Sequence, residues 1–143
     1  MPASSDTEIL RDAMRLFITA QRKHLHDSGA LPQGRMLVTL LRRGSLTQAE
    51  FGRILGLEKS WVSRSVDKLV QMGLVTRSTL ENDRRSVQLQ LSDAGQVAAH
   101  EVQERMNTHA GGVLQALPDS ARERVVAALR ELRDVLQKQS DNT

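Results

Sequence analysis

Two helical patterns followed by an alternating pattern occupy the middle of the chain. The first amphipathic helical pattern covers residues 47–55 and the second covers residues 60–72. A tight connector of four residues, 56–59, which begins with Gly56, separates them. Two short amphipathic helices joined by such a connector are the layout of a helix-turn-helix.

After the second helical pattern the hydrophobic period changes to two. Leu74-Val75 leads into a polar segment at residues 81–85, and Val87, Leu89 and Leu91 then alternate with Gln88 and Gln90. Alternation of this kind indicates half-buried β-strands, and the polar segment between them indicates a turn. We therefore expect a two-stranded β-hairpin, or wing, at residues 74–91.

Apolar residues at helical spacing predict further helices on both sides of this region. We expect helices at residues 7–25 and 33–43 before it. After the wing, Ser92 is the expected N-cap of a long helix that Gly111-Gly112 should bend or weaken, and Pro118 marks the start of a last helix. The predicted fold class is mainly α (α+β). It is one domain over residues 1–140, with the helix-turn-helix at 47–72, the wing at 74–91 and dimerisation helices at 7–25 and 93–139.

The terminal helices carry apolar stripes that require a partner surface. They lie at opposite ends of a compact winged-helix core, which cannot bury both stripes by itself. A second copy of the chain would cover them, so we infer a homodimer joined through the terminal helices.

Length and composition limit the classes of protein that fit. With 143 residues, 39% of them hydrophobic, the chain can form one domain with a substantial core but has no room for an additional catalytic domain of ordinary size. The absence of Cys excludes disulfides, thiolate nucleophiles, Cys-ligated zinc and thiol redox sensing. No signal peptide and no apolar run of membrane-spanning length are present, so we expect a cytoplasmic protein with no membrane partner.

Positive charge is concentrated in the helix-turn-helix and wing. Residues 35–90 hold ten Lys and Arg against five Asp and Glu, an excess of +5, whereas the remainder holds ten against twelve, an excess of −2. A charged helix face is usually just solvated surface, so this asymmetry alone supports nucleic-acid binding only weakly.

The second helical pattern has the outer face that reading of the major groove requires. Val62, Val66 and Leu69 should anchor the helix to the core. The side chains expected to point outward are Trp61, Ser63, Arg64, Ser65 and Lys68. Near the start of the helix, Ser60 and Ser63 could bond bases or backbone, and Arg64 could contact guanine or a phosphate, while Lys68 should meet a phosphate.

Trp61 has two interpretations that stay open. Its indole could pack back on the preceding helix, or it could lie against a thymine methyl group or a sugar. For the whole outward face of residues 60–72, the alternative to DNA contact is an ordinary solvent-exposed helix surface.

Two adjacent arginines stand at the tip of the wing. Arg84 and Arg85 are placed where a guanidinium can enter a narrow minor groove, and Asp83 could orient one of them. A solvated turn would explain the Asn and Asp residues of this segment, but it would not explain two neighbouring arginines.

Motifs for catalysis and cofactor binding are missing from the sequence. It contains no Gly-rich phosphate loop, no Gly-x-Ser-x-Gly elbow and no His pair at metal-binding spacing. The residues that leave a regulatory zinc site open as an alternative are His24, His26, His100 and His109. Surface histidines are the simpler interpretation, so we predict no enzyme activity, no cofactor and no metal.

Several motifs together resemble the MarR family of bacterial transcriptional regulators. They are Leu46-Thr47-Gln48, Leu57-Glu58-Lys59-Ser60-x-Val62-Ser63-Arg64, Gly73-Leu74-Val75, Asp83-Arg84-Arg85 and Leu91-Ser92-x-x-Gly95. The likeness covers nearly the whole chain, up to about Gln139. Two departures are notable: Trp61 is bulkier than the small residue expected there, and the lack of Cys excludes the cysteine oxidation switch of peroxide-sensing relatives.

The resemblance implies a homodimeric winged helix-turn-helix whose recognition helices enter successive major grooves of a pseudo-palindromic operator. By this likeness Thr47 and Gln48 contact the DNA backbone, and Arg85 is the wing arginine, braced by Asp83. Positions that match base and phosphate contacts are Ser60, Ser63 and Arg64. Members commonly repress a neighbouring gene and release double-stranded DNA when a small, often aromatic, effector binds.

The hypothesis that follows is a DNA-binding, ligand-responsive transcriptional repressor. The alternative is a winged-helix protein–protein interaction module, without sequence-specific DNA binding, whose basic face serves an acidic partner.

Overall fold

A computed structural model gives the arrangement of residues 4–80 and 83–142; in the wing, the side chains of residues 80–85 are not described. The chain divides into two compact units, Met1–Met106 and Asn107–Thr143. Its terminal helices are α1 (Asp6–Asp27), α5 (Asp93–Ala116) and α6 (Asp119–Asp141). They begin and end within a few residues of the expected bounds, and α5 continues as a helix through Gly111-Gly112.

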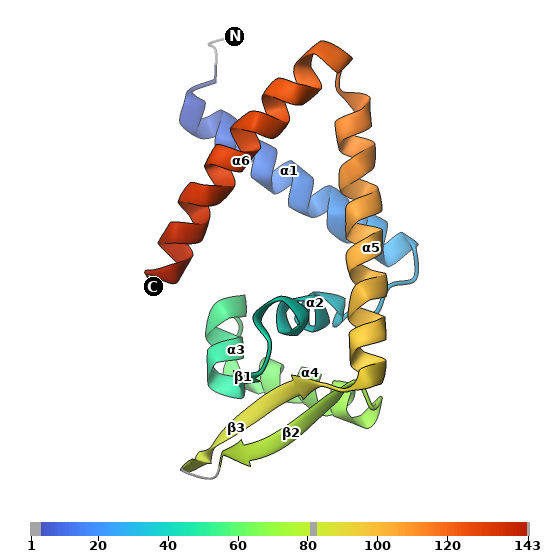
Figure 1. The fold of residues 1–143 in the computed structure, drawn as a ribbon, viewed down its shortest axis with the longest axis vertical. Coiled ribbons are helices and arrows are strands. Elements are labelled where there is room, and N and C mark those ends of the chain that lie inside the picture. The colour runs from blue at the N-terminus through green and yellow to red at the C-terminus, as the bar shows by residue number, and fades with distance from the viewer. Residues whose placement is uncertain (1–3, 81–82, 143) are drawn as a thin grey trace. The chain divides into compact units, whose positions relative to one another are not determined.

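The centre of the first unit is the predicted helix-turn-helix. Helix α2 (Gly34–Arg43) precedes it, and α3 (Gln48–Leu55) and α4 (Lys59–Gln71) form it (Figure 1). A reciprocal capping box fixes the start of α3. The Glu50 N–H donates to the Thr47 hydroxyl at 3.1 Å, and the Thr47 N–H donates to Glu50 Oε2 at 3.4 Å. At the other end Gly56 takes a left-handed conformation, φ 64°, which turns the chain towards α4.

The wing consists of β2 (Val75–Leu80) and β3 (Asp83–Leu91), but it belongs to a sheet of three strands. A short strand, β1 (Leu46–Thr47), pairs antiparallel with β3, so the strand order is β1-β3-β2. Leu46 lies opposite Leu89, and Val75 lies opposite Leu91. The expectation of two strands was therefore incomplete, and the third strand ties the wing to the residue that starts α3.

The helices and the sheet share one hydrophobic core. Its most completely buried side chains come from α2, α3, α4 and β3: Leu37, Phe51, Val62, Val66, Leu69 and Leu89. Along β3 Leu89 is buried, whereas its neighbours Gln88 and Gln90 are half-buried and exposed, so Leu89 faces the core as the period of two predicts. Because α4 buries Val62, Val66 and Leu69 in this core, the core sets the rotation of the helix about its own axis.

A dense junction joins the end of α4 to the start of α5. The Ser92 hydroxyl donates to the Gly73 carbonyl at 2.5 Å, and the Ser92 N–H donates to the Leu74 carbonyl at 3.0 Å. The same hydroxyl accepts from the Gly95 N–H at 3.0 Å, which confirms Ser92 as the N-cap of α5. A Cβ on Gly95 would lie 1.9 Å from the Leu74 carbonyl oxygen, so only glycine fits there.

Of the terminal helices, α5 buries Gly95, Ala99 and Val102, whereas α1 and α6 stay unburied within the chain. Neither α1 nor α6 has a buried residue, and on α1 four large apolar side chains are 45–57% exposed: Ile9, Leu10, Leu16 and Ile18. In the second unit, Arg122 holds the turn between α5 and α6 by donating to the carbonyls of Leu114, Gln115 and Leu117. Among the described residues, no helix has the length and apolar character needed to cross a membrane.

Candidate nucleic-acid interface

Helix α4 has one buried face and one exposed face. The buried positions, spaced i, i+3, i+4 and i+7, are Val62, Ser65, Val66 and Leu69. The expectation that Ser65 points outward was wrong, because Ser65 is only 7% exposed. It stands next to Val66 on the inward side of the helix, where its position outweighs its polarity.

Three of the predicted DNA-contacting residues lie on the exposed face. Ser60, Arg64 and Lys68 are all exposed and follow one another at intervals of four residues. They therefore form one row along α4, opposite the buried stripe. The row carries two cationic side chains and a hydroxyl, all of them groups that can donate hydrogen bonds to bases or phosphates.

The remaining two predicted residues of α4 flank this row. At 3.6 residues per turn, Ser63 lies on one side of the row, together with Asp67, and Trp61 lies on the other side. The Trp61 side chain is 43% exposed, so more than half of it is covered while part of the indole faces solvent. This position is compatible with both expected roles of Trp61, packing on the preceding helix and contact with a thymine methyl group or a sugar.

The start of α3 brings two more predicted residues close to α4. Thr47 and Gln48 are half-buried. The Thr47 hydroxyl is engaged as the acceptor of the capping box, which leaves only its proton to offer to a DNA acceptor. Gln48 is linked to α4 through a residue that the sequence did not identify.

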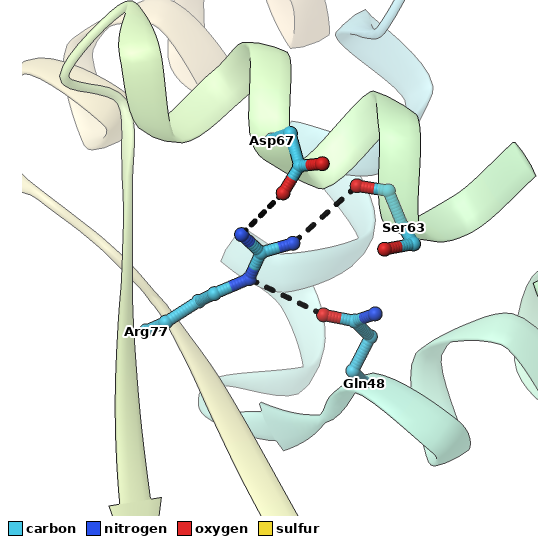
Figure 2. Close-up of polar contacts among 4 residues, drawn as sticks. All are labelled: Gln48, Ser63, Asp67 and Arg77. Carbon is cyan, nitrogen blue, oxygen red and sulfur yellow. Dashed lines mark hydrogen bonds and ion pairs between the residues drawn. The ribbon is translucent and has the colours of Figure 1, made fainter. Parts of the chain in front are cut away.

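That residue is Arg77 on β2, which joins three elements (Figure 2). Its Nη1 pairs with Asp67 Oδ1 at 2.5 Å, its Nη2 donates to the Ser63 carbonyl at 3.3 Å, and its Nε donates to Gln48 Oε1 at 3.4 Å. The guanidinium thereby connects the wing to both helices of the helix-turn-helix. The presence of Asp67 on an otherwise basic outward face was the indication available in the sequence, since a carboxylate facing DNA requires a cationic partner.

A groove lies beside this cluster. It encloses about 610 Å³ between the start of α3, the turn, the start of α4 and β3. The lining residues are Thr47, Gln48, Ala49, Gly52, Arg53, Gly56, Leu57, Lys59, Val62, Ser86 and Val87. Arg53 and Lys59 supply positive charge to a groove whose other members are mostly small or apolar, so an anionic group could enter without meeting a carboxylate among these lining residues.

The predicted DNA-contacting residues at the tip of the wing have side chains that the structure does not describe. Asp83, Arg84 and Arg85 belong to β3 by their backbone, and their side chains lie outside the described residues. Their proposed minor-groove contact stays a prediction.

The histidine alternative gains no support from the described part of the chain. Within residues 4–80 and 83–142, no three His, Asp or Glu side chains come together as metal ligands. Asp27, the carboxylate nearest to His24 and His26 in the sequence, is paired with Lys23 at 2.5 Å. The hydrogen bond from Lys23 holds the pKa of Asp27 below its ordinary value.

Comparison with known proteins agrees with this geometry. The family model described as "MarR family" matches residues 30–87, from α2 to β3. The Bacillus subtilis protein described as an uncharacterised HTH-type transcriptional regulator, YwhA, is 26% identical over 126 residues, which cover 88% of each chain. The HTH-type transcriptional regulator PecS of Dickeya dadantii is 36% identical over 63 residues, 42% of this chain and 38% of that protein.

Solved structures extend the likeness to the full length of the fold. Wild-type MarR from E. coli in its apo form superposes with a TM-score of 0.81 at 16% identity, covering 92% of this chain and 98% of that one. The transcriptional regulator Tm0710 from Thermotoga maritima gives a TM-score of 0.68 at 27% identity, covering 93% and 94%. These matches show that residues 30–87, which carry the exposed basic face of α4, are similar to the winged helix-turn-helix of MarR-family transcriptional regulators, and that the rest of the chain shares their fold.

Proposed function

We propose that this protein is a cytoplasmic homodimeric repressor that binds a pseudo-palindromic operator and leaves it when a small-molecule effector binds. The observation that carries the proposal is the exposed row on α4, which pairs hydrogen-bond donors with positive charge on a helix whose other face is buried. An α-helix fits the major groove of B-form DNA, and donors near its start can reach base edges.

Within this proposal the outward residues divide by the part of DNA that they contact. Ser60, Ser63 and Arg64 are near the start of α4 and are assigned to base edges and the adjoining phosphates. Lys68, one turn beyond Arg64, is assigned to a phosphate, and Thr47 with Gln48 to the backbone on the side of α3. Arg84 and Arg85 are assigned to the minor groove beside the half-site, with Asp83 as a brace.

The unburied terminal helices support the homodimer. The second unit comprises only residues 107–143, and α6 within it has no buried residue. The large exposed apolar side chains of the second unit include Val113 at the end of α5 and Leu129, Val135 and Leu136 on α6. A two-helix segment with no buried side chain on its second helix cannot hold its structure by packing within itself, so burial against a second copy is the source of stability that we propose.

Repression and effector release follow from the family resemblance. A regulator that occupies an operator overlapping a promoter excludes RNA polymerase, and a ligand that prefers the DNA-free conformation shifts the population away from DNA. The lack of Cys directs the search for the effector to small molecules that bind non-covalently, since thiol oxidation is unavailable.

Footprinting on the DNA upstream of the chain's own gene tests the proposal. The expected result is a two-fold pair of protected half-sites about 34 Å apart, one turn of B-form DNA, at moderate salt. A charge-matched random duplex provides the control for non-specific binding. Absence of protection, with binding to an acidic protein instead, would favour an interaction module over a repressor.

A further inference from the structure

We infer that Arg77 acts as a positioning residue that turns the Gln48 amide so that its NH₂ group faces DNA, rather than as a DNA contact itself. The inference rests on the proposed DNA binding and assigns a role to a residue outside the predicted contact set. It starts from the three contacts that the Arg77 guanidinium makes to Asp67, Ser63 and Gln48.

The position of Arg77 leaves it little capacity for a phosphate. Its side chain is 30% exposed, and its positive charge is matched by the Asp67 carboxylate at 2.5 Å. All three nitrogens of the guanidinium take part in contacts within the protein, one to each partner. A phosphate approaching the pair would meet a nearly neutral group and would have to displace Asp67.

The chemistry of arginine determines which way the Gln48 amide faces. Arginine has five N–H donors and no acceptor, so only the oxygen end of a glutamine amide can hydrogen-bond to it. Nε donates to Gln48 Oε1 at 3.4 Å, and Figure 2 shows the amide nitrogen of Gln48 on the side away from the guanidinium. The amide orientation is therefore fixed by Arg77, and the NH₂ group is the end left for an outside partner.

The outside partner must be an acceptor, and the surroundings of Gln48 favour a DNA phosphate oxygen. Gln48 lines the groove that also contains Arg53 and Lys59. A negatively charged acceptor is stabilised there by two cations, whereas a cationic partner is repelled. Gln48 thus donates to a phosphate only when Arg77 holds the Gln48 amide oxygen. This dependence of Gln48 on Arg77 distinguishes a positioning role of Arg77 from a direct contact between Arg77 and DNA.

The test combines operator affinity with its dependence on salt. Arg77→Gln should lower affinity about tenfold, because a hydrogen bond to a charged phosphate is lost. The slope of log Kd against log salt should stay as in the parent in the double variant Arg77→Gln/Asp67→Asn, because both charges of the pair are removed together and no protein–phosphate ion pair disappears. Gln48→Ala should cause a similar loss, and the double variant Arg77→Gln/Gln48→Ala should bind no more weakly than Arg77→Gln alone.

Arg53→Gln is the charge-matched control. It removes one positive charge from the same groove without touching the Gln48 amide, so its loss should add to that of Gln48→Ala. Arg77→Lys supplies a variant that keeps the charge and the pair with Asp67 but cannot form the three-way contact, and it should behave as Arg77→Gln does. Thermal unfolding of each variant identifies any that fails to fold.

In the binding assays, either of two results would overturn the inference. One is a salt slope lowered by about one ion per subunit in Arg77→Gln/Asp67→Asn, which would make Arg77 a phosphate contact. The other is additivity of Arg77→Gln and Gln48→Ala. The NMR resonances of the Gln48 side-chain NH₂ group, measured in the DNA-free protein, test the role of Arg77 independently of DNA binding. They should be shifted from free-glutamine values in the parent and should move to those values in Arg77→Lys.

If the parent binds no operator while those resonances behave as expected, the proposed function fails and the fixed amide stands. If the parent binds operator and its Gln48 resonances already match free glutamine, the inference about Arg77 fails.

Discussion

A methyl group on Gly95 would collide with the backbone that follows the recognition helix. The Cβ of Gly95→Ala would lie 1.9 Å from the Leu74 carbonyl oxygen and 2.9 Å from its carbonyl carbon. Real Cβ contacts are well above 3 Å, so α5 and the segment after α4 would have to separate by more than 1 Å. Backbone cannot yield as a flexible side chain can, and the junction would open.

The cost follows from the hydrogen bonds at this junction. Two of them cross it, from the Ser92 hydroxyl to the Gly73 carbonyl and from the Ser92 N–H to the Leu74 carbonyl. At about 1 kcal/mol each their loss amounts to about 2 kcal/mol, and the better helix propensity of Ala returns about 1 kcal/mol. The expected net destabilisation is about 1 kcal/mol, which lowers the midpoint of thermal unfolding by about 3 °C for a chain of this length.

Thermal and urea unfolding followed by far-ultraviolet circular dichroism measure this effect at one fixed protomer concentration. Gly112→Ala is the matched control, since it lies on the same helix with nothing within 4 Å of the added Cβ, and it should stabilise by up to about 1 kcal/mol. Equal effects of the two substitutions would refute the close approach of α5 to the Leu74 carbonyl. Operator affinity should fall with Gly95→Ala alone, because the junction holds the end of α4.

Three further outcomes follow from the same structure. Arg64→Ala should weaken operator binding by about 1–3 kcal/mol and relax preference at one base pair per half-site, as titrations against substituted operators would reveal; unchanged preference would remove Arg64 from the base contacts. Asp67→Asn should leave the positive charge of Arg77 free to attract a phosphate, so the slope of log Kd against log salt should steepen by about one ion per subunit. An unaltered slope would show that Asp67 does not neutralise the charge of Arg77. Replacing both Leu129 and Leu136 by Asp should weaken self-association by at least about 4 kcal/mol, roughly a thousandfold, in sedimentation equilibrium; a dimer of unaltered strength would place the interface elsewhere.

Local features were predictable because they depend only on residues a few positions apart in the sequence. The capping box of Thr47 and Glu50, the turn at Gly56 and the N-cap at Ser92 each depend on side chains close in the chain. The apolar stripe of α4 was likewise evident from spacing alone, and Val62, Val66 and Leu69 are buried as expected.

Features that depend on distant residues were missed. Strand β1 is two residues long, too short to show an alternating pattern, and it exists only because β3 pairs with it. The burial of Ser65 depends on how α4 packs, and polarity alone suggested the opposite. The contacts of Arg77 join residues 10 to 29 positions apart, which no local pattern encodes.

Gly111-Gly112 shows the limit of propensity rules. Two adjacent glycines predict a weak point in a helix, yet α5 runs on to Ala116. Propensity is a modest term, about 1 kcal/mol per glycine, and the hydrogen bonds on either side of the pair outweigh it.

The chain's one tryptophan provides the most direct test of the central claim that the exposed face of α4 meets DNA. Trp61 lies beside the row of Ser60, Arg64 and Lys68 and is 43% exposed, so its fluorescence can report contact at this face. Quenching of Trp61 by acrylamide should be measured with and without saturating operator, while the anisotropy of labelled DNA confirms binding. We predict that operator shields the indole and lowers the quenching constant, whereas random DNA at the same salt does so less. Operator binding that leaves the quenching of Trp61 unchanged would contradict the account.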